Sequence, residues 1–208
     1  MNSLPEQISA DSAFIRFPGL LKPGTMHEFR APEATAGHLA LVTLLLAELP
    51  LATPILWVSP TATWYPPGLA WLGLDPGRCL FAEARNDAES LGTLEVALRG
   101  GMAGVAESLG LSRLAARRLA LAAKDGNSIG YLLRHASRQT ALDSTSFATR
   151  WLVTPAPNGR LQAELLYAKG AQPAVFVYEI LQEATHGTTA PALPLVHQRD
   201  SAHQRRAG

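Results

Sequence analysis

The segment Ala31-Pro32-Glu33-Ala34-Thr35-Ala36-Gly37-His38-Leu39 carries most of the information on the fold of this chain. A short strand-like run, residues 26–30, precedes it, and a long apolar run typical of a helix, residues 39–49, follows it. A nucleotide-binding P-loop, G-x-x-x-x-G-K-[ST], lies between such a strand and such a helix. The segment therefore occupies the place of a phosphate-binding loop.

The residues that bind phosphate are missing from this segment. Ala31 and Ala36 replace the two glycines, Gly37 replaces the lysine, and His38 replaces the serine or threonine. Gly37 supplies no cation for the outer phosphates, and His38 is a poor ligand for Mg²⁺, which prefers oxygen. We expect neither tight nucleotide binding nor hydrolysis, and hence no enzyme, while weak anion binding at the helix N-terminus stays open.

Composition indicates one globular domain with a substantial core. The chain has 208 residues, of which 47% are hydrophobic and 17% charged. Its one cysteine, Cys79, excludes an internal disulfide and suits a reducing compartment, so we expect a cytoplasmic protein. We see no signal peptide and no apolar run of the ~18 residues that cross a membrane. The histidines lack metal-ligand spacing, so we expect no metal and no cofactor.

The charge is unevenly distributed along the chain. Residues 1–98 carry 5 Lys/Arg and 10 Asp/Glu, a net charge of −5, whereas residues 99–169 carry 10 and 4, a net charge of +6. Such asymmetry favours a basic surface for an acidic partner or nucleic acid, although a basic surface that only maintains solubility remains an alternative.

Strand and helix patterns alternate from residue 26 onward. The expected strands are residues 26–30, 55–59, 79–84, 102–107 and 129–133, and the expected helices are residues 39–49, 66–73, 87–99 and 111–124. Five strands alternating with four helices predict an α/β fold whose mostly parallel sheet has helices on both faces.

The pattern changes in the last third of the chain. Residues 146–154, 160–169 and 174–181 are strand-like and have turns but no helices between them, which predicts an antiparallel C-terminal extension. We therefore divide the chain into an N-terminal arm (1–25), a core domain (26–183) and a tail (184–208) predicted to be disordered.

This order of elements resembles the RecA core. Glu28-Phe29 and Pro32-Glu33 are similar to the RecA run before its P-loop, and Leu72-Gly73-Leu74-Asp75 is similar to a RecA turn. The resemblance places Thr61 at the catalytic glutamate, Glu107 near the metal-holding aspartate, and Lys169 at a lysine that reaches a neighbouring subunit's nucleotide. Thr61 cannot orient a water molecule as a carboxylate does. Lys169 is then either an interface residue or a solvated lysine.

Three collinear stretches are similar to ImuA proteins more specifically. They are residues 64–78, 112–123 and 149–157, which read WYPPGLAWLGLDPGR, SRLAARRLALAA and TRWLVTPAP. The resemblance implies an accessory factor of damage-induced mutagenesis (the SOS response) and translesion DNA synthesis. It also implies three partners: an ImuB-like homologue of the Y-family polymerases, RecA, and an error-prone replicative-type polymerase.

Several residues are candidates for protein or DNA contacts. Arg113, Arg117 and Lys124 form one basic stripe on the helix 111–124, where an acidic partner, DNA or solvent could face them. Arg118 falls on the apolar arc of Leu111, Leu114 and Leu121, so we expect it to pair with Glu107.

Two further sets of candidates lie in the arm and after the fifth strand. Phe14, Ile15 and Phe17 belong to a strand-like segment that could pair with a partner or with its own sheet. Arg134 and Arg138 could contact DNA phosphates, although the segment that follows Arg134 has no aromatic residues for base stacking, so we expect such contact to be weak.

Two other functions remain open at this point. A SulA-like inhibitor of cell division also has a RecA-like core without a P-loop. A divergent RecA-family ATPase with an unorthodox site is the second alternative.

Overall fold

The structure is a computed structural model that describes residues 20–32, 36–60, 65–135, 146–169, 174–179 and 195–199. Nine strands form one sheet in the order β3-β2-β4-β5-β1-β6-β7-β8-β9. The strands are β1 (Thr25–Ala31), β2 (Ile55–Ser59), β3 (Cys79–Glu83), β4 (Ala103–Glu107), β5 (Ile129–His135), β6 (Thr149–Ala156), β7 (Arg160–Ala168), β8 (Val175–Glu179) and β9 (Leu195–Arg199).

Strand β1 lies between β5 and β6 and pairs with both in parallel. The pairs β2–β3, β2–β4 and β4–β5 are also parallel, while β6–β7, β7–β8 and β8–β9 are antiparallel. Successive strands from β1 to β5 are joined through the helices, which are α1 (Gly37–Ala47), α2 (Pro66–Trp71), α3 (Asp87–Arg99) and α4 (Arg113–Asp125). The predicted fold class, a mostly parallel sheet with an antiparallel extension, is confirmed.

The two faces of the sheet bury different clusters. One face packs against α1 through Phe29, Leu45 and Trp151, and the opposite face packs against α3 and α4 through Met26, Leu94 and Leu119. Residues of β1 alternate between these faces, as a pleated strand requires. Both faces of the central strands are covered, which explains why β2, β4 and β5 are apolar along most of their length.

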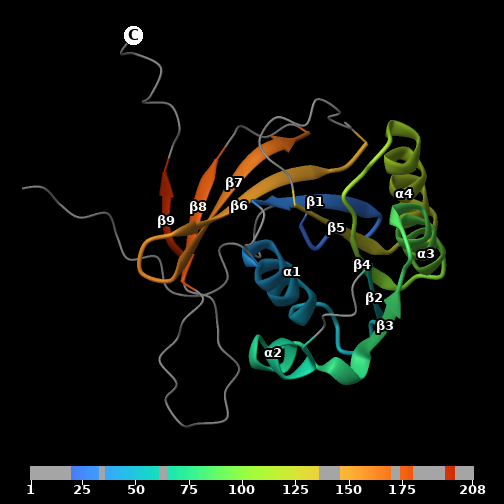
Figure 1. The fold of residues 1–208 in the computed structure, drawn as a ribbon, viewed down its shortest axis with the longest axis horizontal. Coiled ribbons are helices and arrows are strands. Elements are labelled where there is room, and N and C mark those ends of the chain that lie inside the picture. The colour runs from blue at the N-terminus through green and yellow to red at the C-terminus, as the bar shows by residue number, and fades with distance from the viewer. Residues whose placement is uncertain are drawn as a thin grey trace, which may run out of the picture.

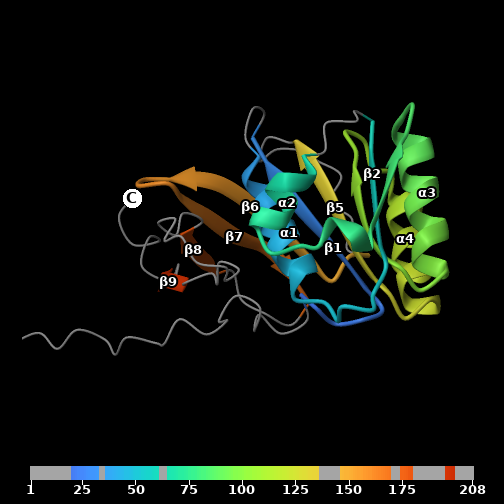
Figure 2. The ribbon, with the colours of Figure 1, turned by 90° about the horizontal axis from the view of Figure 1, so that it is seen from below.

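Helices α3 and α4 lie side by side at one end of the molecule, and β7, β8 and β9 lie at the other end (Figures 1 and 2). Helix α1 lies between these ends, beneath the central strands in Figure 1. The carboxyl ends of β1 and β5 therefore meet the start of α1 at one edge of the sheet, which is where open α/β sheets place their ligands.

Local signals explain most element boundaries. Helix α3 begins after Asn86, whose side chain accepts a hydrogen bond from Glu89 N, and its bounds agree with the prediction. Helix α4 begins at Arg113 rather than at residue 111 because Ser112 is its N-cap and accepts a hydrogen bond from Ala115 N. Strand β9 lies within the segment 184–208 and pairs with β8.

Candidate functional site

The place of the missing P-loop is the junction between β1 and α1. Ala31 is the last residue of β1 and is fully buried, and Ala36 is the N-cap of α1. Among the residues that the structure describes, no side chain caps the start of this helix, and its first turn has no acidic residue. The strand and the helix expected from the sequence are present in the expected order, and residues 33–35 between them lie outside the described part.

Gly37 faces the core at this junction. A Cβ atom at this position would lie 2.8 Å from Leu161 Cδ2 and 3.4 Å from Val153 Cγ1, and both leucine and valine are buried. In a P-loop this position carries the lysine that reaches the phosphates. Here the space that such a side chain would enter is filled by apolar side chains of β6 and β7.

His38 lies beside Gly37 and is also buried. Its Nδ1 has no hydrogen-bond partner among the described residues, and its ring stands edge-on to that of His135, with 4.8 Å between the ring centroids. Burial, together with the neighbouring His135, lowers the pKa of His38 to about 4. The imidazole is therefore neutral near pH 7 and adds no positive charge at the start of α1.

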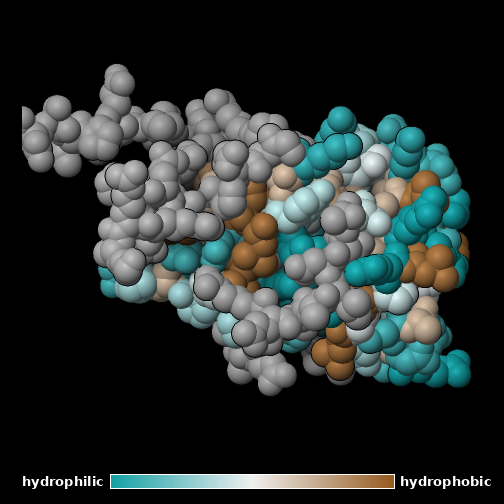
Figure 3. Space-filling model, turned by 90° about the horizontal axis from the view of Figure 1, so that it is seen from above, coloured by the Kyte–Doolittle hydropathy of each residue, from teal (hydrophilic) through white to brown (hydrophobic). Residues whose placement is uncertain are grey.

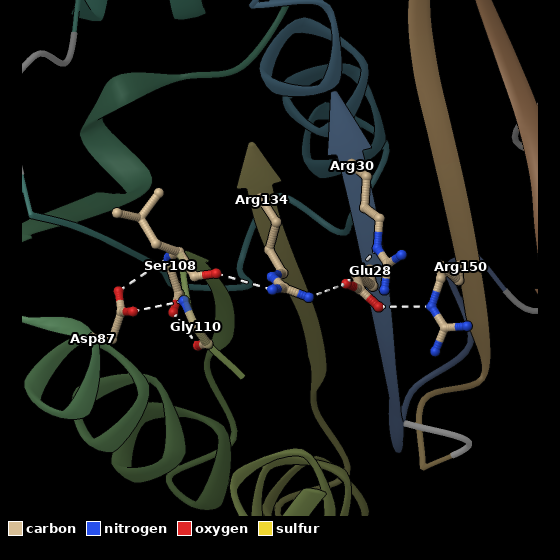
Figure 4. Close-up of polar contacts among 8 residues, drawn as sticks. Glu28, Arg30, Asp87, Ser108, Gly110, Arg134 and Arg150 are labelled. Carbon is tan, nitrogen blue, oxygen red and sulfur yellow. Dashed lines mark hydrogen bonds and ion pairs between the residues drawn. The ribbon is translucent and has the colours of Figure 1, made fainter. Parts of the chain in front are cut away.

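A second polar centre lies on the opposite face of β1. Glu28 is 1% exposed and accepts hydrogen bonds from three arginines. The distances are 2.8 Å to Arg30 Nε, 3.0 Å to Arg134 Nη1 and 2.9 Å to Arg150 Nε. Figure 4 shows the guanidinium groups, from β1, β5 and β6, converging on this one carboxylate.

The arginines determine the charge state of Glu28. Burial alone would raise its pKa, but hydrogen bonds from Arg30, Arg150 and Arg134, with the charge of Arg30, outweigh burial and lower the pKa below its ordinary value. Glu28 is therefore ionised at neutral pH. An ionised carboxylate among three guanidinium groups joins β1, β5 and β6 at the middle of the sheet.

Arg134 also extends this centre toward α3. Its Nη2 donates to the carbonyl oxygen of Leu109 at 2.9 Å, and Asp87, in the first turn of α3, accepts hydrogen bonds from the main-chain N–H groups of Leu109 and Gly110. The loop after β4 is thus tied to both β5 and α3 (Figure 4). Arg134 was a candidate for contact with DNA phosphates, but its side chain is buried and bonded within the protein.

The basic stripe of α4 lies on the surface, as the sequence indicates. Arg113, Arg117 and Lys124 are all exposed. Arg118, however, does not pair with Glu107: it is 59% exposed and contacts Glu95 of α3 at 2.6 Å.

The helical-wheel prediction for Arg118 was wrong because it assigned the wrong buried face. The buried residues of α4 are Ala116, Leu119, Ala122 and Ala123, whereas Leu114 and Leu121 are exposed. Small side chains at most of these positions allow α4 to pack closely against α3, so three alanines and Leu119, rather than Leu114 and Leu121, mark the inner face.

The other candidates are placed as follows. Glu107 ends β4, is half-buried, and accepts a hydrogen bond from Ser90 through its main-chain oxygen. Lys169 is exposed just after β7. Five candidates lie outside the described residues: Phe14, Ile15, Phe17, Thr61 and Arg138.

The Glu28 centre was not predicted from the sequence. One signal was available, because Glu28 and Arg30 are two residues apart in a strand and so share one face. Arg134 and Arg150 also lie in strands that are mostly apolar. Charged residues in buried strands must be paired, and this requirement could have linked the four residues.

Within the described ranges, no three His, Cys, Asp or Glu side chains lie close enough together to hold a metal ion. None of the helices in the described part of the chain is both long and apolar enough to cross a membrane.

The strand order, the helices on both faces and the β1–α1 junction define an α/β protein of a type consistent with a RecA-like core. The chain is similar to Protein ImuA of Caulobacter vibrioides strain NA1000 / CB15N, with 31% identity over 198 residues that cover 82% of this chain and 81% of the relative. The values are the same for Protein ImuA of the strain ATCC 19089 / CIP 103742 / CB 15. No protein-family model matches the chain. At this identity and coverage, the chain belongs to the ImuA family.

Proposed function

We propose that this chain is a non-catalytic accessory protein of damage-induced translesion DNA synthesis. It acts through contacts with other proteins rather than through nucleotide chemistry. Its partners are an ImuB-like homologue of the Y-family polymerases, RecA, and an error-prone replicative-type polymerase. Membership of the ImuA family connects the chain with this process.

The packing at the start of α1 is the observation that supports a protein without catalytic activity. Gly37 faces Leu161 and Val153, and His38 is buried and neutral near pH 7. A triphosphate needs a cation and main-chain N–H groups that are free to approach it, together with an oxygen ligand for Mg²⁺. Gly37 supplies no cation and His38 supplies no oxygen ligand for Mg²⁺, so the fold serves as a scaffold for its surface.

Complementation in the source bacterium tests the proposal. A strain that lacks the gene for this chain is exposed to ultraviolet light, and the frequency of resistant mutants is counted with and without the wild-type gene. We expect damage-induced mutants to fall to the uninduced level without the gene and to recover with it. Unchanged mutation in the deletion strain, with filamentous cells on overproduction, would replace this proposal with the SulA-like alternative.

Affinity capture identifies the partners in the same strain. After DNA damage, the tagged chain is expected to recover the ImuB-like protein or RecA. Recovery of the division machinery alone would contradict the proposed partners.

A further inference from the structure

The outward side of α4 carries two exposed leucines. Leu114 is 68% exposed and Leu121 is 46% exposed. The two residues are seven positions apart, which places them on one side of a helix two turns apart. We call this side, with its basic edge, the α4 face, formed by Arg113, Leu114, Arg117, Leu121 and Lys124.

One edge of the α4 face is positively charged without a matching negative charge. Arg113, Arg117 and Lys124 are exposed, and none of them has an ion-pair partner among the described residues. The opposite edge is different. There Arg118 pairs with Glu95 and Asp125 pairs with Arg99, so charges are matched within the protein.

The surface at this end of the molecule is mixed in hydropathy. In Figure 3, hydrophobic and hydrophilic side chains alternate at the end of the molecule where α3 and α4 lie. Helix α4 is the outermost element at the upper right of Figure 1, so no described element covers its outward side. An apolar strip with one cationic edge is suited to a helix that carries apolar residues flanked by acidic ones.

We propose that the α4 face binds an acidic amphipathic helix of a partner protein. Leucines of the partner helix pack against Leu114 and Leu121, and its carboxylates pair with Arg113, Arg117 and Lys124. This inference rests on the proposed function, because it assigns the surface through which the chain contacts one of its protein partners.

The leucines favour a protein over a nucleic acid as the occupant. A phosphate backbone is bound by cations and hydrogen-bond donors, and sequence-tolerant base contacts use aromatic side chains. Leu114 and Leu121 lie between the two charged edges of α4, where a nucleic acid would leave them without a partner. A protein helix buries the leucines and neutralises the cations at the same time.

Four variants, compared in the assay of damage-induced mutation described above, test whether the α4 face binds a partner. Leu121→Asp and Arg117→Glu alter the α4 face. Leu51→Asp and Arg85→Glu are matched controls, since Leu51 is 80% exposed and Arg85 is 90% exposed, and neither belongs to the α4 face. Circular dichroism and urea unfolding establish that all four variants fold.

We expect L121D and R117E to lower damage-induced mutation by roughly tenfold, which is the effect of losing a central contact at a protein interface. L51D and R85E are expected to match the wild type. If folded L121D and R117E complement as well as the controls do, while the wild type restores mutation, the α4 face is not the interface. If the wild-type gene does not restore damage-induced mutation, that result would instead contradict the proposed function.

Photo-crosslinking in cells identifies the occupant independently of the mutation assay. A benzophenone amino acid is placed at position 121 or at position 51 of the full chain, and irradiated adducts are analysed by mass spectrometry. We expect a damage-dependent protein adduct from position 121 only, joined to an acidic peptide with apolar residues at helical spacing. An adduct to nucleic acid or to a basic peptide, the same adduct from position 51, or no adduct would overturn the proposal.

Discussion

Arg134 of β5 donates a hydrogen bond to Glu28 of the neighbouring strand β1, with Nη1 and Oε1 3.0 Å apart. The same guanidinium binds the carbonyl oxygen of Leu109 through Nη2. One buried side chain therefore links the central strand to the loop before α4.

Glu28→Gln should destabilise the protein strongly. The substitution removes the one carboxylate of this cluster that faces Arg30, Arg134 and Arg150, and breaking a buried ion pair costs about 3–5 kcal/mol. Urea unfolding at pH 7 measures the effect. Glu83→Gln, at an exposed position on the edge strand β3, is the matched control and should change stability by less than about 0.5 kcal/mol. Equal stability of the two variants would show that the Glu28 centre does not hold the strands together.

Acid should also weaken the wild type through Glu28. The folded protein holds the pKa of this carboxyl below its ordinary value of 4.5, so its contribution to stability is present above that pH. The contribution is lost as the pH falls through the folded pKa, because the unfolded chain takes up the proton first. The free energy of unfolding between pH 5 and 2 should therefore fall less steeply in E28Q than in the wild type.

The buried histidines give a second, higher pH window. Burial lowers the pKa of His27 to about 3, and burial with the charge of His135 lowers that of His38 to about 4. Between these values and 6.5 the unfolded chain binds more protons than the folded chain, so stability falls as the pH is lowered. Each histidine contributes a slope of up to about 1.4 kcal/mol per pH unit. Between pH 6 and 4, the free energy of unfolding of His27→Gln should therefore fall less steeply than that of the wild type, by up to about 1.4 kcal/mol per pH unit. The same slope in both proteins would contradict a neutral His27.

The approach of α3 to α4 depends on Gly126. A Cβ atom at this position would overlap the carbonyl oxygen of Leu98, a main-chain atom that cannot rotate away. Gly126→Ala should therefore cost about 2 kcal/mol or more in thermal or urea unfolding. Gly92→Ala is the control, because nothing lies within 4 Å of the added carbon in the middle of α3. That substitution should stabilise the protein by about 0.5–1 kcal/mol through helix propensity.

Asp87 should control the order of the loop after β4. Its carboxylate accepts hydrogen bonds from Leu109 N at 3.0 Å and Gly110 N at 2.6 Å. In Asp87→Ala, amide hydrogen exchange at these two residues should accelerate, with a loss of about 1–2 kcal/mol in protection. Asp75→Ala provides the comparison, since Asp75 accepts from Gly77 N and should change exchange only there. Unchanged exchange at residues 109 and 110 would show that Asp87 does not hold the loop.

The sequence predicted the α/β alternation well because each element has its own local signal. Ile55–Ser59 is a β-branched and aromatic run, and Asp87–Arg99 has an N-cap and a helical pattern, and both elements have the predicted bounds. Strand β9 had no such signal.

The site was less predictable because its contacts are distant along the chain. Glu28 lies 106 residues from Arg134 and 122 residues from Arg150, so only the order of strands in the sheet brings them together. The orientation of α4 was misjudged for a related reason. The neighbour α3 selects the alanine-rich side as the buried face, and the apolar pattern of α4 alone favoured the leucines.

Equilibrium binding of Mg·ATP to the full chain tests the central claim most directly. Isothermal titration calorimetry, with the amide signals of Gly37 and His38 followed by NMR, should show no saturable binding, because Leu161 and Val153 fill the space beside Gly37 and His38 is neutral. Saturable binding in the micromolar range, accompanied by shifts of these two signals, would show that the junction of β1 and α1 still holds a nucleotide. That result would contradict the account of this fold as a scaffold without nucleotide chemistry.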